Sequence, residues 1–172
     1  CKSVVTLQDE TTLEILTSSG STKEFSYDRV FGLDSTQNQV FEDTRHLVQS
    51  GIDGFNVCIF AYGQTGSGKT FTMTGDKANP GLSLRIADEI FRLQDELKAQ
   101  MIITVEVYFL ELYNDSLIDL LFVKDNGPHA SPPPLEIGKD SNGMVVVHGI
   151  TMAEVKSAGE LTALFIAGNA SR

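Results

Sequence analysis

Polar and apolar residues alternate near the start of the chain, a pattern that predicts β-strands with one side facing solvent. Val4–Leu7 and Thr12–Leu16 show this alternation on either side of a polar turn at Gln8–Glu10. A stretch rich in serine and glycine, Thr17–Thr22, separates them from a third predicted strand at Phe25–Phe31. The chain is therefore expected to open with strands.

Apolar residues at helical spacing predict three helices further along the chain. The first is expected to begin with a capping box formed by Thr36 and Gln39, and to end at Gly54. The last is expected to begin with a second capping box, formed by Ser157 and Glu160. The apolar positions of the three helices are Val40, Phe41, Leu47, Val48, Ile52 and Phe55; Ile86, Ala87, Ile90, Phe91, Leu93 and Leu97; and Leu161, Leu164 and Phe165.

One short segment, Val57–Ala61, is wholly apolar and shows no alternation. Such a run is typical of a central strand that helices cover on both faces. Its cysteine, Cys58, is accordingly expected to be a small buried residue. A glycine-rich segment follows at once, and a helix is expected to begin near Lys69.

The second half of the chain contains further strand signals. Met101–Tyr113 is long and rich in β-forming residues. Leu135–Ile137 and Met144–Val147 flank Asp140–Gly143, so they are predicted to form a hairpin with an Asn-Gly turn. Lys124–Pro134 is polar with three consecutive prolines, and is expected to be a surface loop.

Strand and helix patterns alternate along residues 1–172, which predicts an α/β fold. The sequence ends at Arg172 directly after a helical pattern, with no strand to follow. We therefore expect the fold to be incomplete in this chain.

The charge of the chain narrows the choice of partners. It carries 23 acidic and 13 basic residues, a net charge of -10. This argues against nucleic acid and anionic membranes as partners, because both are bound through clustered lysine and arginine.

No apolar run approaches the ~20 residues of a membrane span, and the start lacks the apolar core of a signal peptide. The two cysteines, Cys1 and Cys58, form no disulfide framework, which fits a reducing cytoplasm.

One motif carries recognisable chemistry, the phosphate-binding P-loop G-x-x-x-x-G-K-[ST]. Glycines let the backbone N–H groups point inward at phosphate oxygens. The lysine supplies a positive charge to the β- and γ-phosphates, and the hydroxyl of the final residue is a ligand for Mg²⁺. The residues of the motif are Gly63, Gln64, Thr65, Gly66, Ser67, Gly68, Lys69 and Thr70.

A P-loop alone leaves kinases, GTPases, other ATPases and motors open. The guanine-reading N-K-x-D of a GTPase is absent. A D-x-x-G does occur at Asp140–Gly143, but a hairpin turn explains it better. Glu111 follows an apolar run and is a candidate for the acidic residue that assists Mg²⁺ binding; a polar residue at a strand end explains it as well.

The residues around the P-loop resemble the kinesin motor signature, F-A-Y-G-Q-T-x-x-G-K-T-x-T-M. The similarity is strongest over Asn56–Met73, NVCIFAYGQTGSGKTFTM. Leu84 stands where the family often has proline, and Asp115 where it usually has glutamate. Further matches lie at Tyr27–Phe31, Pro80–Arg85, Glu111–Leu121, Gly168 and Arg172.

The resemblance implies a three-layer P-loop NTPase fold, with a mixed central sheet between helices, of which residues 1–172 are the N-terminal part. It implies ATP or ADP with Mg²⁺ as ligands, Thr70 as the metal-binding residue, and microtubules as the partner in the cytoplasm and cytoskeleton. By position, Phe71 is where the family places a ring against adenine; packing in the core is the other interpretation. The residues that sense the γ-phosphate in this family are expected after Arg172. Residues 1–172 alone are therefore expected to bind nucleotide but to hydrolyse it poorly.

The subclass that the residues resemble most is the kinesins with C-terminal motors, which move toward microtubule minus ends. That group includes the calmodulin-binding kinesins, so calmodulin stays open as a further partner. A dimeric state of the full-length protein stays open as well. Two other functions stay open at this point. One is a kinesin-like structural or regulatory module that binds nucleotide or microtubules without a hydrolytic cycle; the other is an unrelated P-loop ATPase or GTPase.

Overall fold

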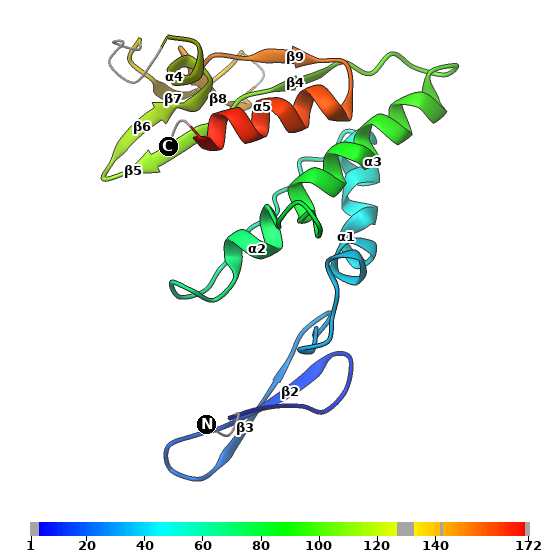
Figure 1. The fold of residues 1–172 in the computed structure, drawn as a ribbon, viewed down its shortest axis with the longest axis vertical. Helices are drawn as coiled ribbons and strands as arrows, with labels where there is room; N and C mark the ends of the chain where they lie inside the picture. Colours follow the sequence, from blue (N-terminus) through cyan, green and yellow to red (C-terminus); the bar gives the residue numbers. More distant parts are fainter. Residues whose placement is uncertain (1–3, 127–132, 142, 171–172) are drawn as a thin grey trace. The chain divides into compact units, whose positions relative to one another are not determined.

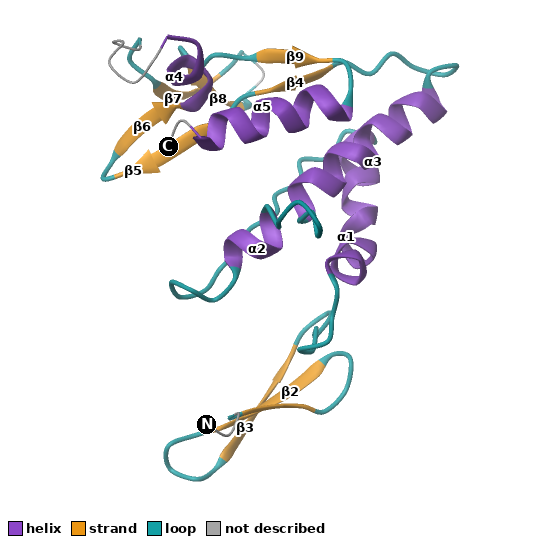
Figure 2. Ribbon diagram, viewed as in Figure 1, coloured by secondary structure: helices purple, strands orange, loops and turns teal. Residues whose placement is uncertain are grey.

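The computed structural model describes residues 4–126, 133–141 and 143–170, and combines helices with small β-sheets (Figures 1 and 2). The prediction of an α/β protein is therefore confirmed. The chain divides into two compact units, Cys1–Leu47 with Cys58–Leu82 and Val48–Val57 with Ser83–Arg172, which are described in turn. Within the described ranges, every helix is too short or too polar to cross a membrane.

The first unit opens with a three-stranded antiparallel sheet, in the order β1 (Val5–Leu7), β2 (Thr12–Leu16) and β3 (Thr22–Ser26) (Figure 1). The first two strands confirm the prediction. The third was expected at Phe25–Phe31, which is wrong beyond Ser26. Ser26 lies opposite Thr12, the first residue of β2, so later residues have no part of β2 left to pair with.

The turn between β1 and β2 is held by a carboxylate. Asp9 Oδ1 accepts hydrogen bonds from the Thr11 N–H at 2.7 Å and from the Thr11 hydroxyl at 2.9 Å. The backbone N–H contributes most to holding the pKa of Asp9 below its usual 3.8. The predicted polar turn thus has a local side-chain cause.

Helix α1 (Gln37–Ile52) begins and ends where the sequence predicts. The Thr36 N–H donates to Gln39 Oε1 at 2.8 Å, and the Gln39 N–H donates to Thr36 Oγ1 at 3.3 Å, so the capping box is complete. At the other end Gly54 has φ 97°, a left-handed conformation that glycine adopts without strain. The next N–H, of Phe55, returns to the Ser50 carbonyl at 3.0 Å.

Replacing Thr36 with alanine is expected to loosen the first turn of α1. Loss of an N-cap side chain costs about 1 kcal/mol, so the Gln39 and Val40 amides should exchange with deuterium about fivefold faster. Hydrogen-exchange mass spectrometry on the full-length protein measures this. Ser35→Ala removes an exposed hydroxyl one residue earlier and should leave the exchange unchanged. Equal protection in both variants would argue against the capping role.

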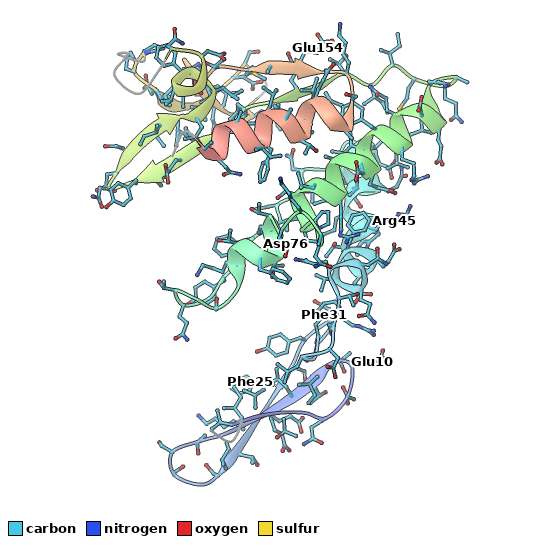
Figure 3. All side chains as sticks on the ribbon, in the orientation of Figure 1. Glu10, Phe25, Phe31, Arg45, Asp76 and Glu154 are labelled. Carbon is cyan, nitrogen blue, oxygen red and sulfur yellow. The ribbon has the colours of Figure 1, made fainter. Side chains whose placement is uncertain are left out.

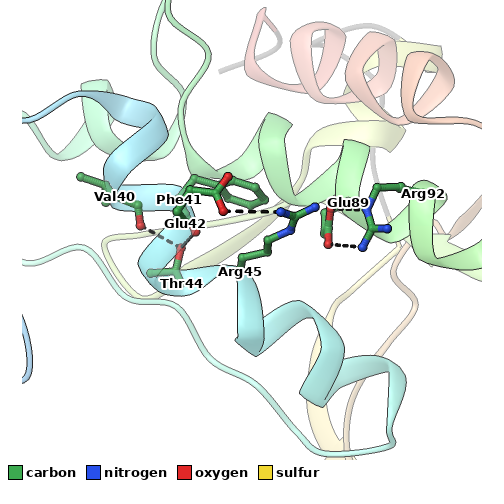
Figure 4. Close-up of polar contacts among 7 residues, drawn as sticks. All are labelled: Val40, Phe41, Glu42, Thr44, Arg45, Glu89 and Arg92. Atoms are coloured by element: carbon green, nitrogen blue, oxygen red, sulfur yellow. Dashed lines mark hydrogen bonds and ion pairs between the residues drawn. The ribbon is translucent and has the colours of Figure 1, made fainter.

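Two polar side chains inside α1 bond within the helix (Figure 4). The Thr44 hydroxyl donates to the carbonyls of Val40 and Phe41 at 3.2 and 3.0 Å. Arg45 pairs with Glu42 at 3.4 Å between Nη1 and Oε2. A threonine in a helix interior is tolerated here because its hydroxyl bonds the preceding turn.

The apolar segment Val57–Ala61 is not a strand in this structure, and the prediction of a buried central strand is wrong here. Val57 is 39% and Phe60 80% exposed, and Cys58 is exposed rather than buried. A strand forms only where neighbours accept and donate its backbone hydrogen bonds. None of the strands in the described part of the chain pairs with this segment.

Helices α2 (Lys69–Met73) and α3 (Leu82–Leu97) follow. The predicted apolar face of α3 is confirmed, with Ala87 and Leu93 buried. On α3, Arg92 donates to both carboxylate oxygens of the buried Glu89, at 2.8 and 2.7 Å (Figure 4). The bonds to Glu89 and then Glu96 raise the pKa of Arg92, so this arginine stays charged.

In the second unit, β4 (Val105–Val107) pairs antiparallel with β9 (Ala153–Val155), and α5 (Ala158–Ala170) runs beside them (Figure 2). The predicted Met101–Tyr113 strand region is thus only partly extended. The start of α5 is capped as predicted, because the Glu160 N–H donates to Ser157 Oγ at 3.1 Å. The Glu160 carboxylate bonds the Lys156 N–H, one residue earlier than in a regular capping box.

Two hairpins complete the second unit. In the first, β5 (Leu110–Tyr113) and β6 (Ser116–Asp119) join through Asn114 and Asp115, which have φ 47° and 60°. Aspartate tolerates this left-handed conformation, which suits the departure from glutamate at position 115. The second hairpin, β7 (Glu136–Lys139) with β8 (Val145–His148), confirms the prediction.

The loop predicted at Lys124–Pro134 begins later than expected. Helix α4 (Leu120–Asn126) covers its first three positions, and residues 127–132 lie outside the described part of the chain. Asp119, a residue 2% exposed, caps the start of this helix, because its Oδ1 accepts the N–H groups of Leu121 and Phe122, each at 3.0 Å. Near its end, Asn126 Nδ2 donates to the Phe122 carbonyl at 3.0 Å, inside the segment predicted as a loop.

Asp119 also joins two distant segments. Its Oδ2 accepts the Thr151 N–H at 2.6 Å, 32 residues along the chain. Around it, the Phe109 and Phe165 rings meet edge to face at 5.8 Å between centroids. Gly168 lies against Phe109, where an added Cβ would come within 3.4 Å of the ring. Leu120, Leu121 and Val155 are also buried, so α4, α5 and β9 enclose one part of the core of this unit.

Candidate nucleotide-binding site

The P-loop folds as a tight loop that leads directly into α2. Gly66 and Gly68 have φ 80° and 96°, both left-handed, and the Ser67 N–H closes a turn on the Gln64 carbonyl at 3.1 Å. Gly68 is the residue that precedes the helix. Other residues pay roughly 1–2 kcal/mol for a left-handed conformation, so these two glycines are required by the backbone itself.

Lys69 lies folded back over the loop. Its Nζ donates to the carbonyls of Gly63 and Gln64 at 2.8 and 2.7 Å. Both are backbone groups of the predicted phosphate-binding loop. The positive charge of Lys69 is therefore directed into the loop.

All nine residues predicted for the site lie together on this loop and helix, in one stretch from Gly63 to Phe71. Thr70 lies in the first turn of α2 and is exposed, so its hydroxyl is accessible. Phe71 is 53% exposed, which leaves its ring accessible to a ligand rather than packed in a core. The seven others are Gly63, Gln64, Thr65, Gly66, Ser67, Gly68 and Lys69.

A second tight loop follows α2. In Figure 3 it carries the label of Asp76, whose Oδ1 accepts the N–H groups of Ala78 and Asn79, each at 2.8 Å. Gly75 has φ 70°, and an added Cβ at Gly81 would lie 2.6 Å from the Met73 carbonyl carbon. The turn-forming residues were a visible signal for this loop. Its effect is to fix where α2 ends.

Sequence reasoning missed one residue that touches the site. Gln37, at the start of α1, is 8% exposed, and its Nε2 donates to the Phe71 carbonyl at 2.6 Å. A glutamine after an N-cap is unremarkable in sequence, so no local signal marks it. The contact joins residues 34 positions apart.

The structure also places the two weaker candidates. Glu111 is the second residue of β5, opposite Ile118, and not at a strand end. Asp140 lies in the turn after β7, where its N–H donates to the Met144 carbonyl and its Oδ1 accepts the Met144 N–H, each at 2.9 Å. Gly143 has φ 81°, and position 142 lies outside the described residues. These contacts support the hairpin interpretation of the D-x-x-G.

Comparison with known proteins gives one consistent family. The kinesin motor domain family matches residues 2–172. Kinesin-like protein KIN-14I of Oryza sativa subsp. japonica is 45% identical over 171 residues, which cover 99% of this chain and 13% of that protein. Kinesin-like protein KIN-14E of Arabidopsis thaliana is 43% identical over 171 residues, which again cover 99% of this chain and 13% of that protein.

A third relative, kinesin-like protein KIN-14S of Arabidopsis thaliana, is 41% identical over 163 residues, 95% of this chain and 21% of that protein. The chain thus spans between 13% and 21% of the length of these relatives. The matched segment includes the P-loop, whose conformation is held by hydrogen bonds within the loop.

Proposed function

The chain belongs to the kinesin motor domain family, and from this premise we propose that it is the ATP-binding part of a motor that couples ATP hydrolysis to movement along microtubules. The observation that carries the proposal is the P-loop itself. Its two left-handed glycines precede α2, and Lys69 lies across the loop carbonyls. Both features support phosphate binding by this loop.

Each residue of the loop has a role in this proposal. The N–H groups from Gly63 to Gly68 surround the phosphates, since the backbone curls where the glycines allow it. Lys69 exchanges its bonds to the loop carbonyls for bonds to the β- and γ-phosphates. The exposed Phe71 ring stacks against adenine.

Mg²⁺ fits the same site. Thr70 presents an accessible hydroxyl in the first turn of α2, directly after the lysine, and an oxygen ligand is what Mg²⁺ prefers. When bound there, Mg²⁺ would supply positive charge that favours phosphoryl transfer. The chain's part is to hold Thr70 beside the phosphates.

Membership of the family also supports a proposal for the finer fold. We propose that residues 1–172 form the N-terminal part of a single motor domain with the three-layer P-loop NTPase arrangement. The microtubule is the proposed partner, and the cytoplasmic cytoskeleton the proposed location. The similarity to the KIN-14 proteins supports this placement.

Microtubules are expected to raise the steady-state ATPase rate of the full-length protein about tenfold or more, which corresponds to lowering the barrier by about 1.4 kcal/mol. The physical reason is that binding energy from the filament is used to complete the catalytic arrangement around a nucleotide already held by the P-loop. The assay compares the rate with and without polymerised tubulin.

Two controls sharpen this assay. Lys69→Ala should abolish the rate in both conditions, which excludes a contaminating ATPase. A protein that binds ATP and microtubules without stimulation would contradict the motor proposal and would favour a regulatory module without a hydrolytic cycle.

A further inference from the structure

Gln37 is a buried polar side chain that bonds the P-loop helix from outside it. It is the first residue of α1, and 8% of it is exposed. Its Nε2 donates to the carbonyl of Phe71, in the middle of α2. A buried amide without a hydrogen bond destabilises the protein, so the Gln37 side chain is held in the orientation that bonds this carbonyl.

The Phe71 carbonyl needs this donor because α2 ends abruptly. In a regular helix it would accept the N–H of the residue four positions later, Gly75. That N–H donates instead to the Thr70 carbonyl at 3.2 Å, which Thr74 also bonds at 2.8 Å. The last carbonyls of a helix lack partners within the helix, and Gln37 satisfies one of them.

The position of Gln37 is itself fixed. The capping box between Thr36 and Gln39 holds the backbone on either side of it. The side chain therefore reaches Phe71 from a rigid helix start rather than from a loop. A rigid support is what a side chain needs in order to orient another residue.

We propose that Gln37 is a positioning residue that holds the Phe71 backbone so that the exposed ring meets the base of the bound nucleotide. This inference rests on the proposed function, because it requires that the P-loop binds ATP or ADP. It makes a separate claim, however. Gln37 supports affinity for the base through Phe71, and the phosphates are held by Gly63–Thr70 without it.

The test compares ADP with pyrophosphate, which lacks the base, in the full-length protein with Mg²⁺ present. Gln37→Met keeps the approximate volume of the side chain and removes the donor. Losing one buried hydrogen bond corresponds to about a fivefold to tenfold weaker Kd for ADP. The Kd for pyrophosphate should stay within about twofold of the original protein, since no phosphate contact changes.

A matched control is available on the same helix. Gln49 Nε2 donates to Asp53 Oδ1 at 2.8 Å, a contact local to the end of α1. Gln49→Met should leave both dissociation constants unchanged. Gln37→Asn, one methylene shorter, provides a second variant that should weaken ADP in the same direction.

A double-mutant cycle isolates the pathway through the ring. In a Phe71→Ala background, Gln37→Met should have no further effect on the Kd for ADP. Equal weakening of ADP and pyrophosphate would show that Gln37 supports the loop in general, and would overturn the inference. An unchanged Kd for ADP in folded Gln37→Met would overturn it as well.

Failure of the proposed function looks different. If the original protein binds neither ADP nor pyrophosphate, the nucleotide proposal fails and this inference falls with it. If both bind and Lys69→Ala weakens both, the proposed function stands and the Gln37 variants decide the inference alone.

Discussion

Lys69→Ala is expected to weaken ATP binding by about 100-fold or more, because two charge-assisted hydrogen bonds of about 1.5–3 kcal/mol each are lost. In this structure Nζ bonds the carbonyls of Gly63 and Gln64, so the charge is already directed into the loop. A phosphate entering the loop meets this cation, which exchanges its two carbonyl bonds for bonds to the phosphate. Removing the cation leaves the phosphate charge opposed only by backbone dipoles.

Titration of a fluorescent ATP analogue against the full-length protein measures this loss. Lys77→Ala is the matched control, since Lys77 is an exposed lysine in the loop after α2. It removes the same charge from the chain without touching the P-loop, and the affinity should stay within about twofold. Similar affinities in the two variants would show that general positive charge, not Lys69, attracts the nucleotide.

Lys69 also bridges two loop carbonyls, so a change in loop structure must be separated from loss of charge. Lys69→Met keeps most of the side-chain stem and removes the ammonium group. The same loss of affinity with an unchanged unfolding temperature would assign the effect to the charge. Partial recovery of affinity in Lys69→Met would instead point to the stem.

Asp119→Ala is expected to lower stability more than any single change at the surface, by about 3 kcal/mol or more. The carboxylate is 2% exposed and accepts three N–H groups, of Leu121, Phe122 and Thr151. Alanine leaves all three donors without this acceptor, and two of them begin α4. Helix α4 should therefore lose its cap and its link to the segment before β9.

Thermal unfolding of the full-length protein, together with amide exchange at Leu121, Phe122 and Thr151, checks this expectation. Asp88→Ala on the exposed face of α3 serves as the control and should change neither measurement. The stability of Asp119→Asn should lie between those of Asp119→Ala and the control. Its amide oxygen still accepts hydrogen bonds, while its NH₂ group faces a donor. Unchanged protection of the three amides in Asp119→Ala would contradict the capping role.

Features that depend on interactions within a few residues are the ones that the sequence pattern predicts correctly. The capping boxes at Thr36 and Ser157 and the left-handed Gly54 are decided within a few residues, so the pattern located them. The hairpin of β7 and β8 is also local. The predictions are wrong where pairing between strands decides the structure. The strand predicted at Phe25–Phe31 ends at Ser26, because β2 has no residue beyond Thr12 to pair with it.

The segment Val57–Ala61 shows the same limit more sharply. Its apolar composition predicted a central strand, yet composition supplies no partner for backbone hydrogen bonds. Where no described strand lies beside it, the segment stays outside the sheets and exposes Val57, Cys58 and Phe60. Burial of Cys58 was inferred from that strand and fails with it.

For the candidate site, the amino-acid pattern alone locates the P-loop and its local contacts. The motif's glycines, lysine and threonine act through their own backbone and nearest neighbours, and Lys69 reaches loop carbonyls only five and six positions away. Packing between distant segments brings Gln37 to the Phe71 carbonyl and Asp119 to the Thr151 N–H, across 34 and 32 positions. A buried polar group takes whichever partner the packing brings to it, and no local pattern records that choice.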